Sequence, residues 1–145
     1  MRFGPSAVAF AAHTLPSIAQ TEGVTAEAAN YLAQIKARAN TSGMSVAEIQ
    51  SSLLSMSKEA FIEECWTERL REFPLEFKIW DDCVRTMKFP QISEDTPGQV
   101  TYVNLIGAQN AAGATFKETD LVFPISLNEL QRNPNLTQNA GYQEN

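Results

Sequence analysis

The 145-residue chain has 17 acidic and 11 basic side chains, which gives a net charge of −6 at neutral pH. This acidic balance argues against a nucleic-acid-binding protein, because such proteins need a basic stripe to neutralise phosphates. The composition, with 43% apolar and 19% charged residues, is that of an ordinary globular domain. No apolar run is long enough to span a membrane.

The first 40 residues predict a helical hairpin. Small apolar residues favour one helix from Pro5 to about Gln20, and a turn at Gly23 leads into a second helix from about Ala26 to Ala39. Thr25 is a suitable N-cap for the second helix. Two helices joined by a short turn are the unit of tetratricopeptide-like arrays.

Residues 45–89 predict further helices. Ser45 and Glu48 have the spacing of a capping box, which indicates a short helix from Val46 to about Leu54. Ser57 is in the position to cap a longer helix that follows.

Large apolar residues recur every three or four positions through this region, which is typical of a helix with one buried face. Before Pro74 they are Phe61, Ile62, Cys65, Trp66, Leu70 and Phe73; after it they are Phe77, Trp80, Val84 and Met87. Proline cannot donate a backbone hydrogen bond and disfavours a helix interior. We therefore expect two helices, or one kinked helix, with the bend near residues 73–75.

Charged residues lie among these apolar ones, and two interpretations remain open. They are Glu68, Arg69, Arg71, Glu72, Asp81, Asp82 and Arg85. They could form a solvated face with weak ion pairs, which composition favours, or a partly buried network of arginines and carboxylates. We further hypothesise that Arg69 bonds a neighbouring carboxylate or carbonyl groups of the C-terminal tail.

No catalytic, cofactor or metal site is predicted, and we expect the chain not to be an enzyme. It has one histidine and lacks nucleophile-elbow, phosphate-loop and zinc-protease motifs. Two cysteines, Cys65 and Cys83, are expected as buried free thiols, although an exported location would permit a disulfide.

After residue 89 the pattern changes to an irregular region with short strands. Phe89-Pro90 is expected to stop the helix, and β-forming residues occupy 100–106. Extended stretches at 114–116 and 121–125 are possible partners, so a two-stranded hairpin across 107–113 is one arrangement. Ser126 is expected to cap a helical turn that ends near Gln131.

The tail from Arg132 to Tyr142 reads R-N-P-N-L-T-Q-N-A-G-Y. Asparagine side chains bond nearby backbone and glycine permits positive φ. We interpret it as an ordered clip, held by side-chain amides, anchored by Leu136 and Tyr142, and closing on the tryptophan-bearing helices. A frayed terminus is the alternative.

Two motifs resemble the C-terminal part of the SusD/RagB family. The first, E-R-x-x-E-F followed by W-x-D-x-x-R, is carried by Glu68, Arg69, Glu72 and Phe73, then Trp80, Asp82 and Arg85. The second, F-P-I followed by N-P-x-L-x-Q-N-x-G-Y, is carried by Phe123, Pro124 and Ile125, then Asn133, Pro134, Leu136, Gln138, Asn139, Gly141 and Tyr142. These are treated as structural signature residues, and no ligand-binding residue is transferred.

The resemblance implies a mainly α fold with a tetratricopeptide-like hairpin, further helices and an irregular or short-β C-terminal region. It also implies a segment of a surface lipoprotein at the outer membrane. Such proteins bind glycans or other nutrients and deliver them to a SusC-like TonB-dependent transporter. The rival hypothesis is an intracellular helical-repeat adaptor that binds a partner protein.

Overall fold

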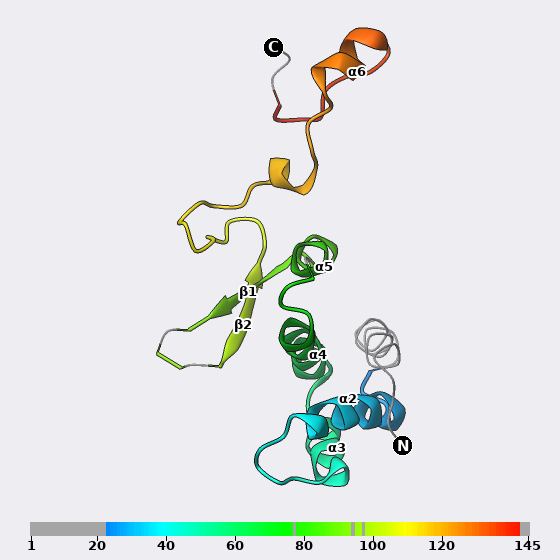
Figure 1. Cartoon of the computed structure of the whole chain (residues 1–145), viewed down its shortest axis with the longest axis vertical. Helices are drawn as coiled ribbons and strands as arrows, with labels where there is room; N and C mark the ends of the chain where they lie inside the picture. The colour runs from blue at the N-terminus through cyan, green and yellow to red at the C-terminus, as the bar shows by residue number, and fades with distance from the viewer. Residues whose placement is uncertain (1–22, 77, 94, 97, 143–145) are drawn as a thin grey trace. The chain divides into compact units, whose positions relative to one another are not determined.

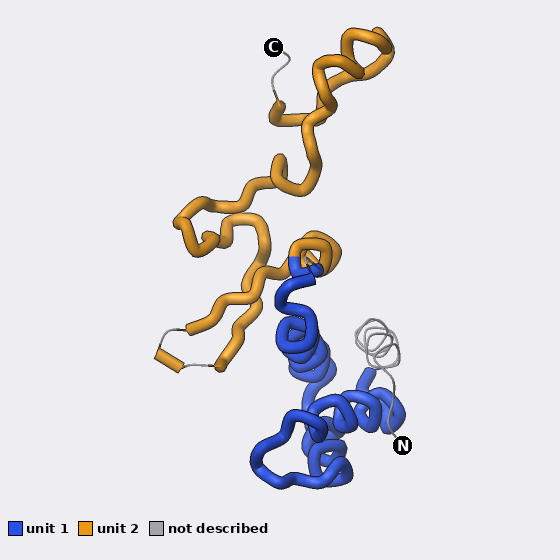
Figure 2. The backbone as a smooth tube through the Cα atoms, viewed as in Figure 1, with its two compact units in different colours: residues 1–79 blue, residues 80–145 orange. Residues whose placement is uncertain are grey.

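The structure is a computed structural model that describes residues 23–76, 78–93, 95–96 and 98–142. The expected helix over 5–20 and the apolar position Phe77 lie outside these described residues. The chain divides into two compact units, Met1–Ile79 and Trp80–Asn145 (Figure 2). Across the described residues the fold is mainly helical with one small antiparallel sheet, in agreement with the predicted mainly α class (Figure 1).

Three helices form the described part of the first unit, and all three begin where the sequence predicts. They are α2 (Ala26–Arg38), α3 (Val46–Leu54) and α4 (Lys58–Glu72). The Thr25 hydroxyl accepts from the Ala28 N–H at 3.1 Å. The capping box of Ser45 and Glu48 is complete, and Ser57 caps α4.

The core of this unit is built from Leu32 and small residues of α2, together with larger residues of α3 and α4. Because α2 presents Ala28, Ala29 and Ala33, α3 can pack closely against it. Leu32, Leu53 and Phe61 are among the most completely buried side chains. The remaining core residues are Ile49, Ile62 and Cys65, with Trp66 partly buried beside them.

The predicted interruption near Pro74 is confirmed, and it produces two separate helices. Helix α4 ends at Glu72, and its C-cap Phe73 leaves helical geometry with φ −126° and ψ 43°. The next helix, α5, spans Lys78–Thr86 and lies almost wholly in the second unit. Proline's missing N–H and its clash with the preceding turn explain the break.

The sheet pairs segments other than those expected. Strand β1 (Lys88–Ile92) is antiparallel to β2 (Val100–Asn104), in a register that runs from Lys88 opposite Asn104 to Ile92 opposite Val100. The interpretation of Phe89-Pro90 as only a helix stop therefore missed a strand. A proline is tolerated there because both strands are edges and need not donate on both sides.

Met87, expected on the apolar stripe of α5, is a second correction. It lies beyond the helix with φ 55°, and its side chain is 41% exposed. Its carbonyl accepts from the Leu105 N–H at 2.9 Å. This left-handed residue turns the chain from α5 into β1, and the buried apolar residue of α5 is Cys83.

The segment after β2 is a compact loop followed by short helical turns. The segment 114–116 does not pair with 100–106 as expected; it meets the stretch expected to be the connecting loop, through the isolated bridge of Gln109 opposite Thr115. The 3-10 helix η1 (Glu118–Leu121) ends at the first residue of the 121–125 segment that was expected to be extended, and Val122 is extended. Helix α6 (Leu127–Arg132) follows, and Ser126 caps it as predicted.

Candidate functional site

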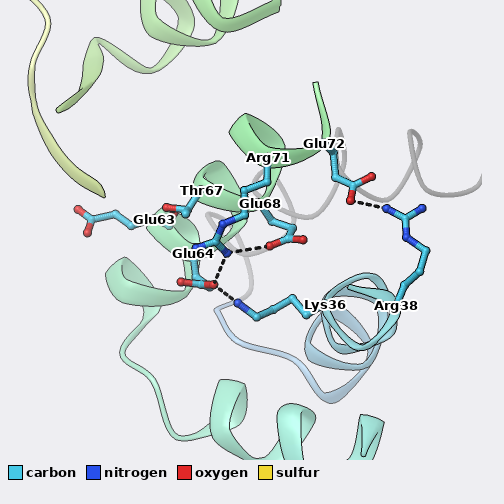
Figure 3. A network of polar contacts seen from close by, with 8 residues as sticks. All are labelled: Lys36, Arg38, Glu63, Glu64, Thr67, Glu68, Arg71 and Glu72. Carbon is cyan, nitrogen blue, oxygen red and sulfur yellow. Dashed lines mark hydrogen bonds and ion pairs between the residues drawn. The ribbon is translucent and has the colours of Figure 1, made fainter. Parts of the chain in front are cut away.

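A network of ion pairs joins α2 and α4 in the first unit, and it includes the signature residue Glu68. The Lys36 ammonium pairs with the Glu64 carboxylate, and Arg71 Nη1 lies 3.1 Å from Glu68 Oε2 and 3.8 Å from Glu64 Oε1 (Figure 3). Arg71 therefore bridges two carboxylates one helical turn apart. Lys36 extends the network to α2.

Arg38 and Glu72 form a second tie between the same two helices. The two side chains are paired in Figure 3. The hydrogen bond to Glu72, followed by its negative charge, raises the pKa of the Arg38 guanidinium above its ordinary value. The end of α2 and the end of α4 are thus held together by a charge-assisted contact.

Glu68 and Arg69 are buried, with 6% and 4% of their surfaces exposed. The favoured interpretation of a fully solvated charged face is therefore wrong for these two residues. Burying a charge is costly unless it is paired, and Arg71 supplies the partner of Glu68. The Arg69 guanidinium carbon lies 5.7 Å from the centroid of the Phe73 ring, within the range of a cation–π contact.

A second cationic side chain, that of Lys78, lies against the Phe73 ring. The Lys78 ammonium lies 4.5 Å from the ring centroid and 2.5 Å from Glu76 Oε2. The bend that follows α4 is thus organised around a buried ring with a cation from each side of Pro74 in the sequence. Of the signature residues, Arg69 and Phe73 contribute to this bend, whereas Glu68 and Glu72 pair with Arg71 and Arg38.

In the second unit, Trp80 belongs to an aromatic cluster. Its ring centroid lies 5.5 Å from that of Phe116, and Phe116 lies 5.0 Å from Phe89. These tilted pairs fix α5, β1 and the end of the loop within one small core. On the same helix, Arg85 donates to Asp82 at 3.1 Å. Both side chains are partly exposed to solvent, as the interpretation of a solvated charged face predicts for these two residues.

The tail amides close on the F-P-I segment. Gln138 donates to the Ile125 carbonyl and accepts from the Ile125 N–H, both at 2.8 Å, so one side chain imitates a strand partner. Asn139 donates to the Phe123 carbonyl at 2.7 Å. The Tyr142 hydroxyl lies 2.9 Å from the carbonyl oxygens of Thr119 and Val122.

Residues 133–142, which we name the C-terminal clip, therefore form an ordered element and not a frayed end. These bonds reach residues 119–125 and not the tryptophan-bearing helices on which the tail was expected to close. Asn133 accepts from the Asn135 N–H and is also the C-cap of α6. Gly141 has φ 89°, and a Cβ there would lie 2.1 Å from Thr119 Cγ2. Leu136, expected as an apolar anchor, is exposed, so Tyr142 is the anchor. Pro124 and Pro134 are exposed.

The cysteines are buried free thiols, as predicted. Burial raises the pKa of Cys65 to about 12 and that of Cys83 to about 11, which makes both poor nucleophiles.

In the part of the chain that the structure describes, no three His, Cys, Asp or Glu side chains gather as a metal site would require. Nor does any helix of those residues have the length and apolar character to cross a membrane.

Sequence reasoning missed the contribution of α2 to the network. By sequence, Lys36 and Arg38 are basic residues that suit a helix C-terminus, and Glu64 is one of two adjacent glutamates; neither pattern indicates a pairing between them. Nothing local in the sequence indicates that these residues meet across two helices. The pairing depends on how α2 packs against α4.

Comparisons with known proteins identify the family. The sequence profile of the SusD family matches residues 18–142. The chain is similar to the crystal structure of a SusD superfamily protein from Parabacteroides distasonis, with 32% sequence identity and a TM-score of 0.73. The match covers 93% of this chain and 26% of that one, so the chain spans about a quarter of the relative's length. A search of curated proteins finds no match. The two motifs and the two comparisons agree, and the chain belongs to the SusD family.

Proposed function

We propose that the chain is part of a cell-surface protein that binds a glycan or another nutrient and delivers it to a SusC-like TonB-dependent transporter. Family membership over residues 18–142 carries this proposal. SusD proteins are outer-membrane-associated binding proteins that work with such transporters. The proposal assigns this chain to the surface of the outer membrane.

Within such a protein, the chain's role is that of a supporting scaffold. The charged groups of the α2–α4 network are engaged with one another, and the clip amides are engaged with backbone. The two thiols are buried with raised pKa values. Side chains used in this way hold helices and turns in place, and we therefore assign no reaction step to them.

The test is to express the complete reading frame that contains the chain and to titrate it with oligosaccharides by isothermal calorimetry. Saturable binding without the release of new saccharides over time is the expected result. The transporter is expected to co-purify from detergent-extracted outer membranes. A time-dependent rise in reducing ends would contradict the assignment as a binding protein.

The rival, an intracellular helical adaptor, predicts a different location. Protease applied to intact cells cleaves a surface protein and leaves a cytosolic one untouched. Full protection of the chain in intact cells, with cleavage after lysis, would favour the adaptor. The result of this assay does not depend on which glycan the protein binds, so it tests the location of the protein independently of its ligand.

A further inference from the structure

The small sheet of the second unit has two outer edges that differ in chemistry. In the described residues β2 has one strand neighbour, β1, so each strand keeps one edge outside the ladder (Figure 1). The Leu105 N–H donates to the Met87 carbonyl, and hydrogen-bonded and non-hydrogen-bonded pairs alternate along the register from that point. The backbone groups of β1 that point away from β2 are therefore those of Lys88, Pro90 and Ile92.

The outer edge of β1 is protected against the addition of another strand. The Lys88 N–H donates to the Thr86 hydroxyl at 3.3 Å. Pro90 has no N–H to donate. A lysine and a proline are among the residues by which proteins prevent an edge strand from pairing with another chain. Because β1 carries both at outward positions, it is a poor partner for a further strand.

The outer edge of β2 carries neither kind of protection. Its sequence, V-T-Y-V-N, has no charge and no proline, and it is rich in β-branched and aromatic residues. Its outward positions, opposite those of β1, are Val100, Tyr102 and Asn104. A two-stranded sheet is marginally stable by itself and gains from further strands. The edge of β2 is therefore the one at which a further strand would add.

The outward positions of β2 are complementary to themselves. When two copies of this edge meet in antiparallel orientation about a two-fold axis at Tyr102, Val100 of one copy lies opposite Asn104 of the other. The outward positions then all fall in hydrogen-bonded pairs. The same pairing brings the Asn104 end of one copy, where Lys88 bonds Asn104, beside the turn end of the other, which carries the exposed Asp95. Charges of opposite sign thus come together at each end of the paired edges.

We propose that the outer edge of β2 binds the same edge of a second copy of this chain and joins two hairpins into one antiparallel sheet of four strands. The strand order is β1-β2-β2-β1. A contact in which both copies use the same surface closes on itself, so assembly stops at a dimer. Because the paired strand has only five residues, the dimer is weak and reversible. The proposal does not depend on the proposed glycan-binding function, which is tested on the complete reading frame.

Sedimentation equilibrium of the 145-residue chain over a series of concentrations tests the proposal. The parent chain should show a reversible monomer–dimer equilibrium. Tyr102→Lys and Tyr102→Glu each place two like charges opposite each other at the two-fold axis, and each should weaken dimerisation by about tenfold or more. An equimolar mixture of the two variants should dimerise again, because lysine then faces glutamate. Gln91→Lys, which adds the same charge to β1 one strand away, is the matched control and should change the dissociation constant by no more than about twofold.

Amide hydrogen exchange gives a second measurement, and it needs no substitution. Exchange at Val100 and Asn104 should slow as the concentration of the parent chain rises. Exchange at Thr101 and Val103, whose N–H groups pair with β1 within one copy, should not change. A chain that stays monomeric at every concentration would overturn the proposal, as would a dimer that the mixed Tyr102 variants cannot restore. The exchange measurement uses the parent chain, so it decides the question if the Tyr102 variants do not fold.

Discussion

Replacing Gln138 by alanine removes the two hydrogen bonds that join the C-terminal clip to Ile125, and one bond within the clip. The carboxamide donates to the Ile125 carbonyl and accepts from the N–H groups of Ile125 and Asn139, at 2.8, 2.8 and 2.9 Å. Each bond contributes about 0.5–1.5 kcal/mol net. The site is only partly buried, so water restores part of the loss, and we expect the clip to lose about 1–3 kcal/mol.

The assay is amide hydrogen exchange followed residue by residue, because the clip can open without unfolding the rest. Exchange at the Ile125 and Asn139 amides should accelerate by about 5- to 150-fold, which is the same free energy expressed as a rate ratio. Gln138→Glu keeps the acceptors but turns a negative oxygen toward the Ile125 carbonyl. It should loosen the clip at neutral pH and less in acid, where a protonated carboxyl can donate.

Gln131→Ala is the control, since Gln131 is an exposed glutamine of α6. It should leave both exchange rates unchanged. If Gln138→Ala also leaves exchange at Ile125 unchanged, the two-way amide contact does not hold the clip, and the reasoning fails.

Three further outcomes follow from other contacts. Gly141→Ala should destabilise the clip by about 1–3 kcal/mol, because its φ is 89° and the new Cβ would lie 2.1 Å from Thr119 Cγ2; exchange at the clip amides measures this. Arg69→Ala should lower the free energy of unfolding by about 1–3 kcal/mol in urea titrations, because it removes a buried charged group that stacks on a ring. Burial raises the pKa of Cys65 to about 12 and of Cys83 to about 11 from an ordinary 9.0. The unfolded chain therefore loses thiol protons first, so the stability that the neutral thiols contribute is complete below pH 9.0 and falls as the pH rises through those values in urea titrations.

Each of these has a matched control. Gly113→Ala has a similar φ of 81° but open space at its Cβ, so the excess effect at Gly141 measures the clash, and Thr119→Ser should relieve it. Arg132→Ala removes an exposed arginine and should not lower the free energy of unfolding. Unfolding curves of Arg69→Ala that superimpose on those of the parent would show that the buried Arg69 guanidinium does not stabilise the fold. Cys65→Ala should flatten the alkaline fall in stability; an unchanged fall would assign it to other groups.

Local signals in the sequence correctly predicted most helix starts. Ser45, Ser57 and Ser126 each cap a helix with a hydroxyl, and capping depends on residues only three positions apart. The break at Pro74 was equally local. The strand at 88–92 was missed because a Phe-Pro pair signals a helix end but says nothing of the β2 segment that pairs with it.

The candidate site divides in the same way. The signature pattern identified Glu68 and Arg69, yet composition favoured a solvated face for them. Their burial follows from the packing of α4 against its neighbours. In the same network, Glu64 pairs with Lys36, which lies 28 residues earlier in the chain. Ion pairs between residues so far apart in the chain produce no periodic pattern in the sequence, so they could not be predicted from it.

The sequence alone determined the family, the caps, the helix break and the amide-rich character of the tail, because each depends on motifs or neighbours close along the chain. Tertiary structure decided which carboxylates are buried, which strand pairs with β2, and that the clip closes on residues 119–125 while Phe123 stays exposed. These outcomes depend on contacts between distant segments. Their free energies are set by burial and by hydrogen-bond geometry, which no local pattern contains.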